Sequence, residues 1–261
     1  MSQRQSARPE QRARTKATEA TEATEATEAT VDAEARARVR ADEAAITGSR
    51  RTAMTLRGAA REFWRHPSPW MIGATLLLLS GARISVGDWR VEDVYAPVVL
   101  IALFPVLEWM IHVVVLHWRP RRLAGITVDT PLARKHRAHH ADPRNIPLLF
   151  IPWKSLIYVI IGYNAISLLA FPRTGQALSF MLTVAAIGLL YEWTHYLVHS
   201  DYRPRSRVYK AVWRNHRLHH YKNEHYWFTV TTAATADRLF GTYPAPAGVT
   251  TSPTAKNLHG I

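Results

Sequence analysis

The sequence contains no cysteine among its 261 residues. Disulfide bonds, thiolate metal sites, iron–sulfur clusters and cysteine nucleophiles are therefore excluded. Any metal ion that the chain binds must be held by nitrogen and oxygen ligands. The chain is well supplied with one such ligand, because it has 13 histidines.

The first 65 residues lack a long apolar run. They are rich in Arg, Glu, Thr and Ala, and the tract ATEATEATEATEAT at 17–30 repeats every three residues without an apolar face. Such a segment cannot bury enough surface to offset its chain entropy, and it does not have the pattern of a secretory signal. We expect a disordered cytoplasmic tail at 1–65, one folded membrane domain at 66–245 and a C-terminal tail at 246–261.

Four apolar segments follow the tail, at 70–86, 94–118, 156–171 and 177–198. A transmembrane helix needs about 20 apolar residues, so the second and fourth are long enough and the other two need flanking residues. Arg83 can reach water from the end of the first, and IPLLFIPW at 146–153 can lie in the membrane interface. Their length argues against the alternative, core helices of a soluble domain.

The net charge of +13 is compatible with nucleic-acid binding or with the cytoplasmic face of a membrane protein. Its distribution favours the membrane, because the connections after the first and third segments carry few cations. The other two are strongly basic: Arg119, Arg121, Arg122, Arg134, Lys135, Arg137 and Arg144 in one, and Arg203, Arg205, Arg207, Lys210, Arg214, Arg217 and Lys222 in the other. The positive-inside rule places both, and both termini, in the cytoplasm, without a nucleic-acid partner.

Ten of the histidines form four groups. They are His112 and His117; His136, His139 and His140; His195 and His199; and His216, His219 and His220. On this topology all four groups lie at the cytoplasmic face. The sequence thus predicts an all-α integral membrane protein, with four transmembrane helices and a cytoplasmic helical cap that carries the histidines.

The histidine spacing indicates shared metal binding. Residues three or four apart lie on one side of a helix, as in the pair His195 and His199. His112 and His117 are five apart and would point about 140° from each other, so they serve different metals or their helix is distorted. Ten imidazoles exceed the need of one ion, and we expect two metals. We assign structural roles to the isolated histidines, His66, His225 and His259.

Two acidic residues stand close to these histidines. Glu108 precedes His112 by one turn, and Glu192 precedes His195 by three residues. Each is a candidate acceptor for the free ring N–H of a metal-bound histidine. The alternative is that each pairs with a neighbouring arginine.

The motifs HxxxxH, HxxHH, HxxxH and HxxHH, in this order, resemble the fatty acid hydroxylase (sterol desaturase) superfamily of membrane di-iron enzymes. The likeness covers roughly 69–243 and includes the string DRLFGT, which begins at Asp237. It implies that the ten clustered histidines bind two iron ions, with O₂ as oxidant and Asp237 as a further supporting residue. It also implies a hydroxylase-like catalytic domain, a lipid substrate from the bilayer and a separate electron donor of ferredoxin or cytochrome b5 type.

Hydroxylation of a fatty acyl or other lipid is the expected reaction, because attack on an unactivated C–H bond needs redox chemistry that zinc lacks. Desaturation of a lipid, sterol or carotenoid remains an alternative, since acyl-CoA desaturases share two of the motifs. From another class, a zinc- or haem-binding membrane protein stays open, although the zinc hydrolase motif HExxH is absent. The Ala- and Arg-rich composition suggests a bacterial cell membrane, and the oligomeric state is left open.

Overall fold

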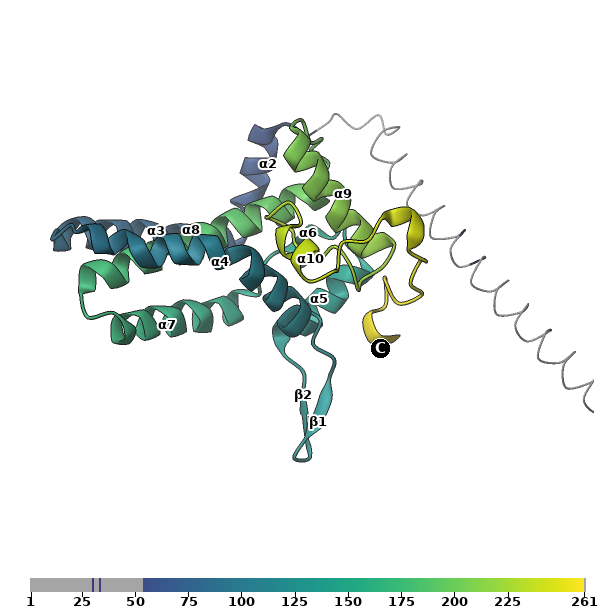
Figure 1. The fold of residues 1–261 in the computed structure, drawn as a ribbon, viewed down its shortest axis with the longest axis horizontal. Coiled ribbons are helices and arrows are strands. Elements are labelled where there is room, and N and C mark those ends of the chain that lie inside the picture. Colours follow the sequence, from purple (N-terminus) through teal and green to yellow (C-terminus); the bar gives the residue numbers. More distant parts are fainter. Residues whose placement is uncertain (1–29, 31–32, 34–53, 261) are drawn as a thin grey trace, which may run out of the picture.

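The computed structural model describes residues 30, 33 and 54–260 (Figure 1). The predicted tail up to residue 53 otherwise lies outside the described residues. Its predicted extension to residue 65 is wrong, because Leu56–Phe63 form helix α2, whose first turn is capped by the hydroxyl of Thr55. Ala59 and Phe63 are buried from this helix, and they pack in a core with residues of α6 and α8.

Four helices are long and apolar enough to cross a membrane. The first is α3 (Pro67–Val86), and the second joins η1 (Val91–Val94), α4 (Tyr95–Met110) and η2 (Ile111–Leu116). The third joins α6 (Ile146–Leu149) and α7 (Trp153–Ala170), and the fourth is α8 (Thr174–His199). The prediction of four spans is confirmed, and the short third segment is extended by α6 as its flanking residues suggested.

The exposed side chains of these helices are those expected to face lipid. Leu77 of α3 and Leu169 of α7 are 75% and 88% exposed, and both belong to apolar helices. A helix that is apolar on all sides suits a lipid environment. The spans run side by side in Figure 1, where α8 packs against α3, α4 and α7. These helices mark the chain as a membrane protein.

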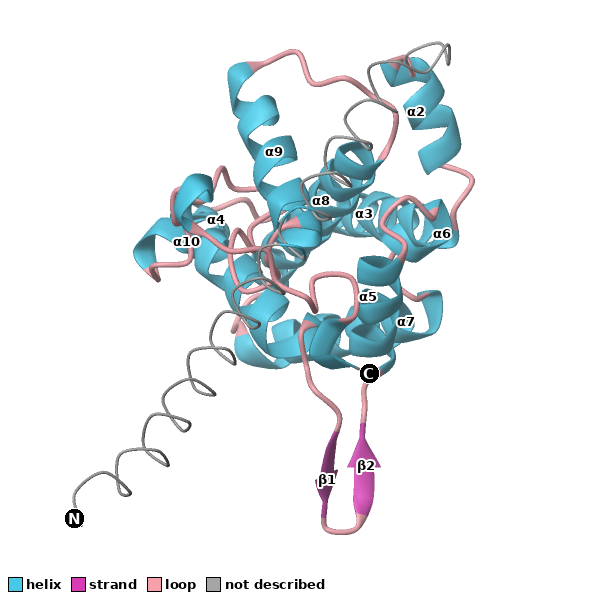
Figure 2. Ribbon diagram, turned by 90° about the vertical axis from the view of Figure 1, so that its right-hand side faces the viewer, coloured by secondary structure: helices cyan, strands magenta, loops and turns pink. Residues whose placement is uncertain are grey.

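A smaller cap extends from one end of the bundle (Figure 1) and faces the viewer in Figure 2. It contains α5 (Pro131–Ala141), α9 (Arg207–Tyr221), α10 (Thr235–Leu239) and the short helices η3 (Pro246–Gly248) and η4 (Leu258–Gly260). A hairpin of β1 (Arg121–Leu123) and β2 (Ile126–Val128) projects from the cap, with Arg122 opposite Thr127. The two longest cap helices begin at hydroxyl caps, Thr130 for α5 and Ser206 for α9.

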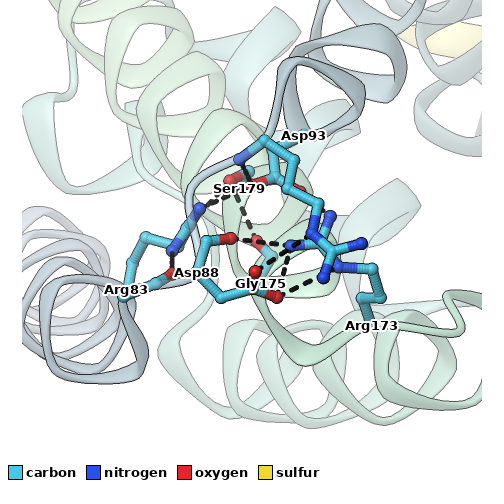
Figure 3. A network of polar contacts seen from close by, with 8 residues as sticks. Arg83, Asp88, Asp93, Arg173, Gly175 and Ser179 are labelled. Carbon is cyan, nitrogen blue, oxygen red and sulfur yellow. Dashed lines mark hydrogen bonds and ion pairs between the residues drawn. The ribbon is translucent and has the colours of Figure 1, made fainter.

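An ion-pair network lies at the end of the bundle away from the cap, and Figure 3 shows it from close by. Arg83 of α3 is only 1% exposed, and it binds Asp93 of η1 at 2.6 Å and Ser179 of α8 at 3.1 Å. Arg173 binds the second carboxylate oxygen of Asp93 at 2.9 Å and Asp88 at 2.7 Å. The expectation that Arg83 reaches water is therefore wrong, because a buried carboxylate and a hydroxyl satisfy its guanidinium inside the protein.

We predict that Arg83→Ala destabilises the protein by about 3 kcal/mol or more, because it removes one partner of a buried ion pair. The denaturant midpoint of the purified protein in detergent would measure this loss. Arg90→Ala is the matched control, since Arg90 binds Asp88 at the exposed edge of the same loop. Equal midpoints for the two variants would contradict a structural role of the buried pair.

Candidate metal centre

All ten motif histidines meet at the end of the bundle next to the cap. Their ring nitrogens form two groups in which every ligand atom lies within 4.8 Å of the others. Cluster A contains His112, His117, His136, His140 and His219. Cluster B contains His139, His195, His199, His216 and His220. The predicted convergence of the four motifs is confirmed, and each cluster could hold a metal ion.

Each HxxHH motif contributes to both clusters. In α5 the residues four apart, His136 and His140, point to cluster A, whereas His139 points to cluster B. Helix α9 reverses this division, with His216 and His220 in cluster B and His219 in cluster A. The two cap helices therefore lie across both clusters, while each membrane helix supplies histidines to only one.

A π-helical turn brings His112 and His117 together. The helix changes from α to π at η2, and the amide of His117 donates to the carbonyl of His112 at 3.0 Å, five residues earlier. Residues five apart then lie on one side, and the two rings are 5.0 Å apart between centroids. The expectation that the two serve different metals is wrong, and its alternative, a distorted helix, is confirmed.

The spacing of the ring nitrogens fits metal ions. In cluster A, Nε2 of His136 is 3.2 Å from Nε2 of both His112 and His140. In cluster B the corresponding distance is 3.1 Å for His139 and His195. Two nitrogens bound at right angles to one ion about 2.1 Å away would be about 3.0 Å apart. The donor spacing is therefore compatible with one metal ion in each cluster.

Burial keeps the cap histidines in the neutral form that binds metal. It lowers the pKa of His136, His139, His140, His216 and His220 well below the ordinary value, and that of His219 to about 4. Other histidines nearby lower the pKa of most of these rings further, because positive charges on neighbouring rings would repel one another. At neutral pH these rings therefore present lone pairs to the centre.

Backbone carbonyls orient three of the rings. Nδ1 of His140 lies 2.9 Å from the carbonyl of Ala255, Nδ1 of His195 lies 3.1 Å from that of Leu149, and Nδ1 of His219 lies 2.8 Å from that of Tyr226. Such contacts fix the ring orientation and leave Nε2 for the metal. The segment at 246–261, predicted to be a separate tail, is part of the site through Ala255.

The carboxylates of Glu108, Asp237 and Glu192 hydrogen-bond to backbone amides and hydroxyls, and so support the histidine rings indirectly. Glu108 accepts hydrogen bonds from the amides of Val230 and Thr231, and Asp237 accepts them from the amides of Phe228 and Thr229. The predicted contact of Glu108 with a ring N–H is therefore replaced by backbone contacts, because four unpaired amides of an irregular loop need an acceptor. The alternative arginine partner is not found among the described residues.

Glu192 also binds a backbone amide and a hydroxyl instead of a histidine ring. Its carboxylate accepts from the hydroxyl of Ser68 and from the amide of Ile151, both at 2.7 Å. Ile151 lies two residues after Leu149, whose carbonyl contacts His195. The predicted direct contact of Glu192 with a ring is thus corrected to an indirect one, through the loop that orients His195.

Several contributors to the site have no signature in the sequence. The three carbonyl acceptors belong to ordinary residues, and Phe228 packs its ring against His112, His117 and His219 at 5.2–5.5 Å between centroids. The aromatic-rich string before DRLFGT is the only signal that pointed to this loop.

The three histidines assigned structural roles lie outside both clusters. His66 stacks on Phe150 at 4.1 Å, and the exposed His225 pairs with Glu224 at 3.5 Å. His259 contacts the backbone carbonyl of His117 at 3.0 Å, so it supports the site from the C-terminal segment.

The fold and the site together define a helical membrane protein with a double histidine centre. The model of the family described as fatty acid hydroxylase matches residues 97–242, more than half of the chain, and the chain belongs to this family. A solved structure titled "Full length scs7p (only hydroxylase domain visible)" is similar in fold, with 18% identity and a TM-score of 0.58. The likeness covers 71% of this chain and 68% of that one. No curated protein matches the sequence.

We predict that the two clusters can be emptied separately. Replacing His136 and His140 by Ala removes two ligands from cluster A, and replacing His216 and His220 by Ala removes two from cluster B. Each double variant should bind one metal ion fewer per chain than the wild type, as measured by elemental analysis after metal loading. A variant that loses all of its metal, or none, would contradict two separate sites.

Proposed function

We propose that this protein is a non-haem di-iron oxygenase that hydroxylates a fatty acyl chain or another lipid with O₂. The observation that supports it most directly is the pair of five-histidine clusters at the end of four apolar helices. Iron held by these residues would supply the redox chemistry that breaks an unactivated C–H bond, which zinc cannot supply. Membership of the fatty acid hydroxylase family supports the same reaction class.

The protein's own groups prepare this centre. The ten imidazoles would hold the ions, and the carbonyls of Leu149, Tyr226 and Ala255 keep three of the rings in orientation. Phe228 packs against rings of cluster A, where its apolar ring would hinder the access of water. Because His112, His195 and His199 belong to membrane helices, a lipid in the bilayer can approach the centre without leaving its apolar environment.

Electrons would come from a separate ferredoxin or cytochrome b5-type protein with its reductase. The cap suits an acidic donor, because Arg119, Arg122 and Arg205 are exposed on it. Desaturation is the second candidate reaction, since removal of two hydrogens from a lipid uses the same kind of oxidant. Product mass distinguishes the two.

We predict that His139→Ala abolishes lipid oxidation, because it removes a buried ligand from cluster B. Lipids from cells that express the wild type or the variant would be compared by mass spectrometry. The wild type should give a lipid heavier by one oxygen, whereas a desaturase would give one lighter by two hydrogens.

His225→Ala is the control for this substitution, since His225 is exposed and lies outside both clusters. It should retain full product formation. Full activity of His139→Ala would contradict its assignment as a ligand. A haem absorption band in the purified wild type, or bound zinc in place of iron, would contradict the proposed centre.

The proposed topology places the cap and both termini in the cytoplasm of a bacterial cell. The positive-inside rule supports it, because the cap connections are basic. The absence of cysteine gives a clean background for labelling at single introduced thiols.

We predict that Glu92→Cys, in the exposed turn at the end away from the cap, reacts with a membrane-impermeant maleimide in intact cells. Arg205→Cys, in the cap, should react only after the cells are opened. Gel-shift detection of the label measures both. The reverse pattern would place the histidine centre outside the cytoplasm.

A further inference from the structure

A pocket of about 620 Å³ lies where the cap meets the third span. It is formed by the first turns of α5 and α7, which lie close together in Figure 2. Its lining includes Arg134, Trp153, Lys154, Ser155 and Tyr158. None of them is a histidine of the two clusters, and we call this site the α5–α7 pocket.

The walls of the α5–α7 pocket are apolar, but two cations line it. Lys154 makes no ion pair among the described residues, and its ammonium group lies 5.5 Å from the ring centre of Trp153. Arg134 is 56% exposed, and one terminal nitrogen of its guanidinium donates to the backbone carbonyl of Asp129 at 2.6 Å and stands 3.8 Å from the carboxylate of that residue. Its other terminal nitrogen is left for another anion. The hydroxyl-bearing residues Ser155 and Tyr158 lie in the same lining. This combination suits a ligand with a negatively charged head and an apolar body.

The position of the pocket indicates where that ligand comes from. Trp153 and Lys154 lie in the first turn of α7, near the cap end of the third candidate span, and Lys154 is the one charged residue of that span. We therefore place the membrane boundary close to them. Aromatic and basic side chains concentrate at this boundary, where lipid phosphates lie. Along the same helix, Ile161 and Leu169 are exposed at helical spacing from Tyr158 and offer an apolar path into the bilayer.

We propose that the α5–α7 pocket binds the headgroup of an anionic phospholipid, with one acyl chain along the exposed side of α7. The phosphate would bridge Arg134 of the cap and Lys154 of the span. Helix α5 also carries His136, His139 and His140, so the bound lipid would tie the metal-binding helix to the membrane surface. This site does not depend on the reaction that the histidine centre catalyses.

Native mass spectrometry of the full-length protein tests the proposal. The protein is reconstituted in vesicles with equal amounts of phosphatidylglycerol and phosphatidylcholine, extracted, and measured for retained lipid. We expect one retained phosphatidylglycerol per chain. The double variant Arg134→Gln with Lys154→Gln should retain about thirtyfold less, because two cations near the anionic surface are lost.

Two further variants separate this pocket from general charge effects. Lys154→Arg keeps the charge and should retain phosphatidylglycerol as the wild type does. Lys210→Gln removes an exposed cation elsewhere on the cap, and it should also leave retention unchanged. Folding of all variants is checked by their metal content, which the pocket substitutions should not alter.

Three outcomes would overturn the proposal. One is equal retention of phosphatidylcholine and phosphatidylglycerol by the wild type. Another is unchanged phosphatidylglycerol retention by the double variant. The third is displacement of the phospholipid by added palmitate at low concentration, which would show that the pocket takes a free carboxylate lipid instead.

Discussion

Ten imidazole rings gathered in one largely buried region impose the constraint on which the rest of this structure depends. Each ring has two nitrogens, and a buried polar atom without a partner costs free energy. Within the described residues, Nδ1 of His112, His139, His216 and His220 and Nε2 of His199 are buried without a hydrogen-bond partner. Positively charged rings cannot relieve the problem, because their mutual repulsion favours the neutral form. Metal ions held in the two clusters would use the lone pairs of the converging nitrogens, and we expect such ions to stabilise this region.

The same constraint explains the near-symmetry of the two clusters. Each takes two histidines from a membrane helix, two from one cap helix and one from the other. The membrane pairs reach this arrangement in different ways, because His195 and His199 are four apart in an α-helix whereas His112 and His117 are five apart. The π-helical turn η2 absorbs the extra residue, and π-turns inside helices are frequent at functional sites. An HxxxxH motif in a π-helix is therefore geometrically equivalent to HxxxH in an α-helix.

The sequence was sufficient to predict the spans, the convergence of the motifs and the ten histidines, because these depend on apolar length and on side-chain identity. It was not sufficient for the division of each HxxHH motif between the clusters, since that depends on how α5 and α9 face each other. The backbone carbonyls that accept from the histidine rings could not be predicted either, because every residue has a carbonyl and the sequence does not mark these three. Helix α2 was missed because it has too few apolar residues to stand alone. It is held by tertiary packing, in which Phe63 contacts Phe150, Trp193 and Tyr196.

The buried carboxylates show how a site made from several segments can be kept rigid. Glu108 is in a membrane helix and Asp237 in a cap helix, yet both bind amides of the irregular segment at 228–231. That segment follows Tyr226, which orients His219, and includes Phe228, which packs on three rings of cluster A. Glu108 of the membrane helix α4 therefore supports the ring of His219 indirectly, by binding the segment that follows Tyr226. A carboxylate that bound a ring directly would orient one ligand, whereas one that holds a loop orients every ligand the loop contacts.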